Sequence, residues 1–403
     1  MFKEGCKFFL FRRPLKVWEN LVFPSYAFTI GFLFLCSCVE QEKMKKLSDT
    51  EVLYSTRIGI FLPVNHKQQD VNKIAIQYFN SAKLAVDDLR PLPIEMLLYE
   101  TDGTADTMNK ELQNAINDNI QIAIGLIDPF ETKLLSSNLH NTKLKFITFA
   151  DKKSGLGFDM FHMGLSRMNL ADQIIEYSID QGYNKFLILE SINQEGAIDS
   201  TDLKKLIESK NGTIINYLKV SETQDFLSKM QMMISDFNIS SQKEAIILLG
   251  TPEQNLIFAL ASLKSSMGKE RGERIQVIGL SSWAMERNIL SEPAFEGVWF
   301  PFVNNQRFGE FSRRYHKLYG SKPTKESVVA YDSIAAIGAL IRNAEKLDIP
   351  DPFIKSSITN KSGFLGVLGT FRFLENGSSE RLLGILESNI DGIQILKKPL
   401  DRF

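Results

Sequence analysis

Short apolar runs alternate with amphipathic segments along most of the chain. The run RIGIFLPV, residues 57–64, is almost continuously apolar up to Pro63, as a strand buried on both faces requires. After it, apolar residues recur three and four positions apart from Ile74 to Leu89, which predicts a helix that ends before Pro91. The same alternation predicts further strands at residues 94–100, 120–127, 144–150, 185–191, 213–220, 245–250 and 275–281, with helices between them.

The order of these elements predicts an α/β fold with two parallel sheets. Strands separated by helices form parallel sheets that carry helices on both faces. The strands up to residue 150 make one series, and those from residue 185 make a second series of the same kind. Two helical faces follow within residues 308–341, separated by Gly320 and Pro323, and no short repeat typical of a solenoid is visible.

The first 38 residues have the pattern of an export signal. Five Lys and Arg residues between positions 3 and 16 precede an apolar run, residues 21–35, and the run is followed by Ser37 and Cys38. The segment resembles a bacterial lipoprotein signal, in which Cys38 receives lipid on its sulfur and becomes the first mature residue. A retained transmembrane anchor is the alternative, and the run is slightly short for it. We expect a periplasmic protein, lipid-anchored to the bacterial cell membrane or outer membrane.

Composition restricts the body of the protein further. Residues 39–56 are polar and without periodicity, so we expect a flexible tether there. All three cysteines lie at or before Cys38, so the body has no disulfide and no thiolate nucleophile. With 47 Lys and Arg against 48 Asp and Glu, the chain has no excess positive charge to attract nucleic acid, and we expect no such partner.

Three segments resemble a known family. They are IGIFLPV (residues 58–64), FSRRYHKLYGSKPTKESVVAYDSIAAIGAL (residues 311–340) and GVLGTFRFLENGSSERLLGILESNIDGIQIL (residues 366–396). In wording and order they are similar to the type I periplasmic binding proteins, especially the leucine/isoleucine/valine-binding family of ABC transporters. The third is the most specific, because a strand ending in Phe-Arg-Phe precedes the turn at Asn376 and Gly377, and Asn-Gly favours a hairpin turn.

This resemblance implies two doubly wound parallel-sheet lobes that are joined by several chain crossings and close around a small ligand. It places the first lobe at residues 57–163 and 306–350, and the second lobe with a closing hairpin at residues 164–294 and 356–403. Open α/β sheets bind ligands at the carboxyl ends of their strands. We therefore expect ligand contacts from residues that follow predicted strands: Asp128, Thr132, Asp151, Glu190, Thr251, Ser281 and Trp283.

The loops that follow the strands depart from the family pattern. Hydroxyl side chains are expected after IAIG and FITF, but the first loop retains only Thr132. Asp128 and Glu131 would repel a ligand carboxylate unless Lys152 or Lys153 offset them. Helix capping and turn formation are the alternative roles for each of the polar candidates, because Asp, Ser and Thr favour such positions, and lobe packing is the alternative for Trp283.

Catalytic chemistry is not indicated. The four histidines are widely separated, and none belongs to a two-histidine motif with metal-ligand spacing. No nucleophile elbow, phosphate-binding loop or dinucleotide fingerprint is present. We expect a protein that is not an enzyme and that needs no metal and no cofactor.

Two functions remain open. The first is a ligand-capturing lipoprotein of an ABC transporter, which binds an amino acid or a peptide and delivers it to a membrane permease. The second follows from a resemblance to lipoproteins that activate penicillin-binding proteins and stimulate peptidoglycan synthesis through contacts with a cell-wall synthase. A transporter component needs a closed polar site, whereas an activator can work without a ligand.

Overall fold

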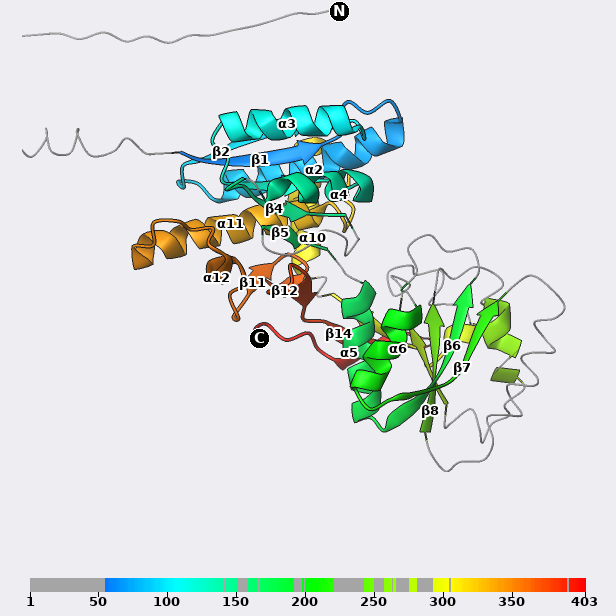
Figure 1. The fold of residues 1–403 in the computed structure, drawn as a ribbon. Helices are drawn as coiled ribbons and strands as arrows, with labels where there is room; N and C mark the ends of the chain where they lie inside the picture. Colours follow the sequence, from blue (N-terminus) through cyan, green and yellow to red (C-terminus); the bar gives the residue numbers. More distant parts are fainter. Residues whose placement is uncertain are drawn as a thin grey trace, which may run out of the picture. The chain divides into compact units, whose positions relative to one another are not determined.

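The computed structural model (Figure 1) describes most of the body of the protein. The described residues are 55–140, 142–150, 159–164, 167–191, 198, 200–220, 243–249, 257–262, 264–265, 275–280, 293–303, 306–389 and 391–403. The predicted export signal, Cys38 and nearly all of the predicted tether lie outside them. Within the described part of the chain, no helix is both long enough and apolar enough to cross a membrane.

The first sheet has five parallel strands in the order β2-β1-β3-β4-β5. The chain passes from β1 to β2 on one side and then returns past β1 to β3, so the topological switch point lies between β1 and β3. The strands are β1 (Thr56–Leu62), β2 (Ile94–Glu100), β3 (Ile122–Gly125), β4 (Lys145–Thr148) and β5 (Met160–His162).

Helices cover both faces of this sheet, as the alternating pattern predicts. Buried residues of α2 (Gln69–Asp88) and α11 (Val328–Leu347) form one core cluster with Ile58 and Ile60 of β1. Buried residues of α3 (Ala105–Asn117) and α4 (Pro129–Leu139) form another cluster with Phe61, which points to the opposite face. Apolar residues on both faces explain the continuous apolar run of this strand.

The second sheet has seven strands in the order β15-β14-β10-β9-β8-β6-β7. Strands β7, β6, β8, β9 and β10 are parallel and repeat the strand order of the first sheet, whereas β14 and β15 extend the sheet antiparallel. The strands are β6 (Tyr183–Ser191), β7 (Thr213–Val220), β8 (Lys243–Leu249), β9 (Ile275–Gly279), β10 (Trp299–Phe302), β14 (Gly384–Asn389) and β15 (Gly392–Lys397).

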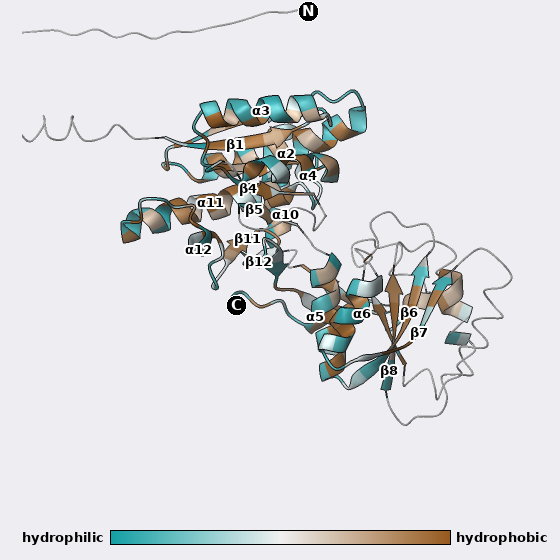
Figure 2. Ribbon diagram, viewed as in Figure 1, coloured by the Kyte–Doolittle hydropathy of each residue, from teal (hydrophilic) through white to brown (hydrophobic). Residues whose placement is uncertain are grey.

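Two core clusters enclose the second sheet. Helices α5 (Arg167–Asp180) and α6 (Ser200–Ser209) pack on the face that carries Phe186 and Ile188. The other face carries Leu187 and packs against residues 259–260 and the 3-10 turn η2 (Pro293–Phe295). Figure 2 shows the hydrophobic colour along much of the strands and a mixture of colours on the covering helices.

A three-stranded antiparallel sheet packs with the first lobe. Its strands β11 (Phe364–Gly366), β12 (Gly369–Phe373) and β13 (Ser379–Arg381) follow α10 (Gln306–Tyr319), α11 and the short α12 (Lys355–Ile358). Phe371 and Phe373 belong to the same cluster as α2 and α11. The expected turn joins β12 to β13, with Gly377 at φ 82°. The two-lobe division of the chain stays a prediction. Apolar residues within 364–383 belong to the core cluster that also contains α2 and α11.

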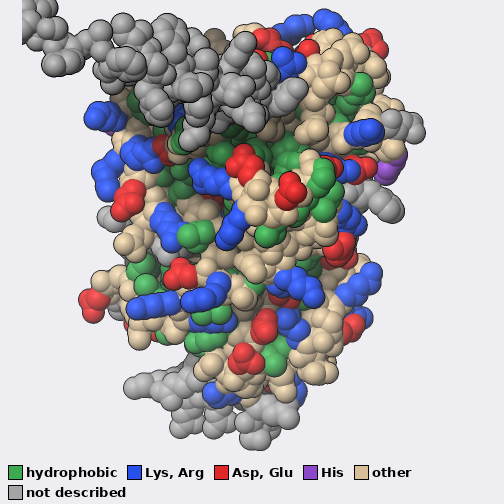
Figure 3. Space-filling view, turned by 90° about the vertical axis from the view of Figure 1, so that its left-hand side faces the viewer, with side chains coloured by type: hydrophobic (Ala, Val, Ile, Leu, Met, Phe, Trp, Pro, Cys, Tyr) green, Lys and Arg blue, Asp and Glu red, His purple; other side chains and the backbone are tan. Residues whose placement is uncertain are grey.

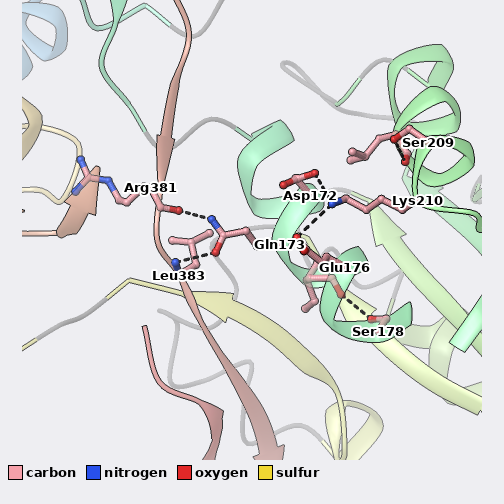
Figure 4. A network of polar contacts seen from close by, with 10 residues as sticks. Asp172, Gln173, Glu176, Ser178, Ser209, Lys210, Arg381 and Leu383 are labelled. Carbon is pink, nitrogen blue, oxygen red and sulfur yellow. Dashed lines mark hydrogen bonds and ion pairs between the residues drawn. The ribbon is translucent and has the colours of Figure 1, made fainter. Parts of the chain in front are cut away.

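The chain segment between β13 and β14 connects these two groups of elements. Gln173 of α5 donates from Nε2 to the backbone oxygen of Arg381, and its Oε1 accepts from the backbone N–H of Leu383 at 2.9 Å (Figure 4). Asn169 of the same helix accepts from the backbone N–H of Arg381 at 3.0 Å. Helix α5, which packs on the second sheet, therefore makes three hydrogen bonds to the backbone of residues 381–383, where the chain passes from the first group of elements to the second.

The surface shows no accumulation of one sign of charge on the face drawn in Figure 3. Lys and Arg side chains alternate there with Asp and Glu side chains. The formal net charge of −1 for the whole sequence agrees with this mixed distribution.

Candidate ligand site at the carboxyl ends of the strands

Three of the seven predicted ligand contacts lie in the described part of the chain. Asp128 and Thr132 are at the start of α4, just after β3, and Glu190 is near the end of β6. All three therefore lie beside a topological switch point, the first two near β1 and β3 and the third near β6 and β8. Asp151, Thr251, Ser281 and Trp283 lie outside the described residues, as do Lys152 and Lys153.

The turn that leads from β3 into α4 is tight. Gly125 has φ 129° and Leu126 has φ 53°, so two consecutive residues have positive φ. A Cβ atom at Gly125 would lie 2.2 Å from the backbone oxygen of Phe61, so only glycine fits beside β1. The backbone N–H of Leu126 donates to that same oxygen at 3.0 Å and fixes the turn against the strand.

Asp128 is the N-cap of α4. Its Oδ1 accepts from the backbone N–H of Phe130 at 2.7 Å and of Glu131 at 3.0 Å, and Pro129 occupies the first helical turn. This is the capping role that the sequence allowed as an alternative. The carboxylate satisfies N–H groups at the start of α4 that would otherwise attract an anion.

Thr132 links α4 to β4. Its hydroxyl donates to the backbone oxygen of Asp128 at 2.9 Å and lies 3.1 Å from the hydroxyl of Thr148, the last residue of β4. Thr148 in turn contacts the backbone oxygen of Leu126 at 3.2 Å and accepts from the backbone N–H of Ala150 at 3.2 Å. Both threonines are buried, so this network holds the ends of β3 and β4 in place.

Glu131 points into the protein rather than toward solvent. It is 1% exposed, and its oxygens accept from the backbone N–H of Gly103 at 2.8 Å and from the hydroxyl of Thr101 at 3.3 Å. Burial raises the pKa of Glu131, and the two hydrogen bonds oppose that shift only in part. Glu131 thus joins the end of β2 to α4, and the expectation of a loop charge facing the ligand is wrong for this residue.

Glu190 is a buried acid near the end of β6 in the second sheet. The phenol of Tyr217 on β7 donates to its Oε2, and the ammonium of Lys219 lies 3.4 Å from the same oxygen. Lys219 itself is largely exposed, whereas Glu190 is 8% exposed. The arrangement places a buried carboxylate at the carboxyl end of β6, beside a lysine whose charge is screened by solvent.

The structure thus brings Asp128 and Thr132 together and adds residues that the sequence analysis missed. Thr101, Thr148 and Tyr217 complete the polar networks at the strand ends. Thr101 directly follows a predicted strand, so its position was a usable signal. Thr148 and Tyr217 lie within strands, where only the register shows which neighbour each residue meets. Among the described residues, no group of three or more His, Cys, Asp and Glu side chains is placed to hold a metal ion.

A family model described as periplasmic binding protein matches residues 58–390. The chain belongs to this family. The match confirms the resemblance noted in the sequence, and it assigns the protein to a class of binding proteins rather than to enzymes. Membership in a family of periplasmic proteins also agrees with the expected compartment. No curated protein matches the chain.

Solved structures with the same fold come from several bacteria. A putative branched-chain amino acid ABC transporter protein from Rhodospirillum rubrum is 15% identical, with a TM-score of 0.66 over 85% of this chain and 100% of that chain. A substrate-binding protein from Desulfitobacterium hafniense in complex with Leu is 18% identical, with a TM-score of 0.56 over 84% and 99% of the two chains. These likenesses confirm the predicted α/β fold with two mostly parallel sheets.

A third solved structure binds a different kind of molecule. It is the solute-binding protein of an ABC transporter from Rhodopseudomonas palustris BisB5 in complex with 3,4-dihydroxybenzoic acid, 18% identical, with a TM-score of 0.51 over 86% of this chain and 96% of that chain. The same fold therefore holds ligands of different chemistry. The fold alone does not define the ligand, which depends on the side chains of each binding site.

Proposed function

We propose that this protein is the substrate-binding lipoprotein of an ABC transporter. It captures a small ligand that carries an amino group, such as an amino acid or a short peptide, between its two lobes and delivers it to a membrane permease. The observation that carries this proposal is the buried carboxylate of Glu190 at the carboxyl end of β6, in a chain whose family binds ligands.

The charges at the strand ends favour the ammonium part of such a ligand. Asp128 and Glu190 are two acidic residues beside the switch points, and among the described residues the ammonium of Lys219 forms an ion pair with Glu190 Oε2. We assign Glu190 Oε1 as the acceptor for the ligand ammonium, because a charge-assisted hydrogen bond to a buried carboxylate is strong. A ligand carboxylate is not expected at the start of α4, where Asp128 already accepts from Phe130 and Glu131.

Ligand capture depends on movement of the lobes about the segments that connect them. The segment that Gln173 and Asn169 bind is one such connection, and short segments between rigid bodies act as hinges. In the proposed complex, lipid on Cys38 holds the protein at the membrane, and residues 39–56 let the body reach the permease. The apolar run and the small residue before Cys38 support this anchor.

An activator of penicillin-binding proteins is the second candidate. One observation favours it. The side chains of Asp128 and Thr132 form hydrogen bonds within the protein, to groups of α4 and β4. The first sheet therefore offers fewer polar side chains to a ligand than the family pattern predicts. Such a protein would stimulate a cell-wall synthase through surface contacts and would need no ligand.

A thermal-shift panel with the full chain separates these candidates. The probes are the common amino acids, short peptides and soluble peptidoglycan fragments. A ligand at one hundred times its dissociation constant adds about 2.7 kcal/mol of stability, which raises the melting temperature by several degrees. A shift with one amino acid or peptide supports capture. No shift with any probe, together with stimulated synthase activity, would contradict capture and support the activator.

A further inference from the structure

Strand β15 presents an unpaired edge and two exposed isoleucines. It is the last strand of the seven-stranded sheet in the part of the chain that the structure describes. Ile393 is 55% exposed and Ile395 is 50% exposed. A Cβ atom placed on Gly392 would meet no atom within 4 Å, so the sheet face is uncovered at the first residue of the strand. Exposed edges with apolar side chains are templates for pairing with another strand.

The hydrogen bonds of β14 show which backbone groups of β15 face outward. Ser388 donates its N–H to Val298 at 3.0 Å, and its backbone oxygen accepts from Gly297 at 2.7 Å, so both groups point away from β15. Ser388 lies opposite Ile393, and Leu386 lies opposite Ile395. In an antiparallel ladder these are non-hydrogen-bonded pairs, so the N–H and C=O groups of Ile393 and Ile395 point to the open edge.

These directions restrict how two copies of β15 can pair. In an antiparallel pair, only residues whose backbone groups face outward form the hydrogen-bonded positions. If the two-fold axis passes through Gln394, Ile393 lies opposite Ile395 of the second copy, and each of these pairs exchanges two hydrogen bonds. The apolar side chains of both strands then meet on one face of a continuous sheet.

The charges at the two ends of the strand match the same register. A bulge between Ile385 and Leu386 leaves Leu396 as an extra residue in β15. Because of this extra residue, the register places Asp391 opposite Lys398 of the second copy. Both residues then lie on the same face of the sheet as Ile393 and Ile395. Asp391 and Lys398 are both exposed. An axis through Ile393 would instead place Asp391 opposite Ile395, and an axis through Ile395 would place Lys398 opposite Ile393.

We propose that β15 is a dimer interface, which binds a second copy of this chain through antiparallel pairing about Gln394. The occupant is a second copy because the strand is complementary to itself in backbone direction, apolar side chains and charge. The pairing joins two seven-stranded sheets into one and covers the open edge of both.

Sedimentation of the full chain tests the charge pairing. The wild type is expected to dimerise with rising concentration. Asp391→Lys or Lys398→Asp alone should weaken the dimer roughly tenfold, because each change acts twice across the two-fold axis. The double variant should restore it. Lys397→Asp is the matched control, since it changes the same charge on the opposite face and should leave the dimer nearly unchanged.

A symmetric cysteine tests the position of the axis. Residues at a non-hydrogen-bonded antiparallel pair have Cα atoms about 4.5 Å apart, within disulfide range. Gln394→Cys should form a cross-linked dimer on mild oxidation beyond the level of the parent chain, whereas Lys397→Cys should not. A chain that stays monomeric at every concentration, or a dimer that ignores the charge exchange and the Gln394→Cys cross-link, would overturn the proposal.

Discussion

Asp128 and Glu131 lie three positions apart and show why residue types alone did not define the site. The sequence identified Asp128 as a ligand contact or a cap, and the structure shows the cap. Glu131 was expected to face the ligand beside Asp128, yet the helical turn that Asp128 starts carries Glu131 inward to Gly103. Only the packing of α4 against the end of β2 distinguishes the two carboxylates, and that packing cannot be derived from local sequence.

The raised pKa of Glu131 predicts that the stability of the protein depends on pH. Its pKa in the folded chain is raised above the ordinary value of 4.5, so the folded state binds the proton more tightly than the unfolded state. Its ionisation therefore destabilises the fold as the pH rises from the ordinary pKa through the folded pKa. We expect the stability of Glu131→Gln relative to the wild type to increase as the pH rises above the ordinary pKa of 4.5, measured by urea unfolding.

The exposed Glu208 of α6 provides the control for this measurement. Glu208→Gln changes the same chemical group on the surface and should show no comparable gain with pH. If the stability advantage of Glu131→Gln over the wild type stayed constant or decreased as the pH rose, this result would contradict the effect of burial on the pKa of Glu131.

Asp332 and Arg381 form a buried ion pair that joins α11 to β13. Their side chains are 0% and 2% exposed, with Oδ2 and Nη1 3.3 Å apart. Burial raises the pKa of Asp332 and lowers that of Arg381, and their mutual attraction opposes both shifts. Asp332→Asn leaves a buried guanidinium without its counter-charge and should cost about 3–5 kcal/mol of unfolding free energy.

The surface pair between Arg90 and Asp87 is the matched control for this ion pair. Its atoms are 2.8 Å apart, but both side chains are exposed. Asp87→Asn should therefore change the unfolding free energy by less than about 1 kcal/mol. Chemical unfolding measures both variants. Equal losses of unfolding free energy for Asp332→Asn and Asp87→Asn would show that burial does not determine how much an ion pair contributes to stability.

At the scale of elements, the long apolar runs were the reliable signal. They predicted the parallel strands from β1 to β9 except β5, because a strand buried on both faces must be apolar throughout. β5 and β10 were missed. β5 has only three residues, and β10 contains Pro301, which argues against a strand even though the apolar run around it spans residues 298–303.

Helix α4 provides a prediction at this scale. Asp128→Ala removes the acceptor for two N–H groups at its start and should cost about 1 kcal/mol of unfolding free energy. Asp128→Asn keeps an oxygen acceptor and should cost only a few tenths of that amount. Chemical unfolding of both variants measures the difference. If the two variants lost the same stability, charge rather than capping would be the role of Asp128.

At the scale of the whole molecule, the two sheets repeat one strand order, which the sequence predicted only as two series of similar elements. The family resemblance supplied the crossings between them. What neither showed is that apolar residues within 364–383 belong to the first core, because that contact depends on tertiary packing with α2 and α11. The contacts of Gln173 with Arg381 and Leu383 join residues more than two hundred positions apart, beyond any local pattern.

Titration calorimetry of the full chain is the most direct test of ligand capture. The probe is the amino acid or peptide that gives the largest thermal shift, and the variants are Glu190→Gln and, as the exposed control, Glu208→Gln. We expect the wild type and the control to bind one ligand per chain. Glu190→Gln removes a hydrogen bond to a charged group, which contributes about 1.5–3 kcal/mol. We therefore expect this variant to bind the ligand roughly 10- to 100-fold more weakly than the wild type. Unchanged affinity in Glu190→Gln, or no binding by the wild type, would contradict the account.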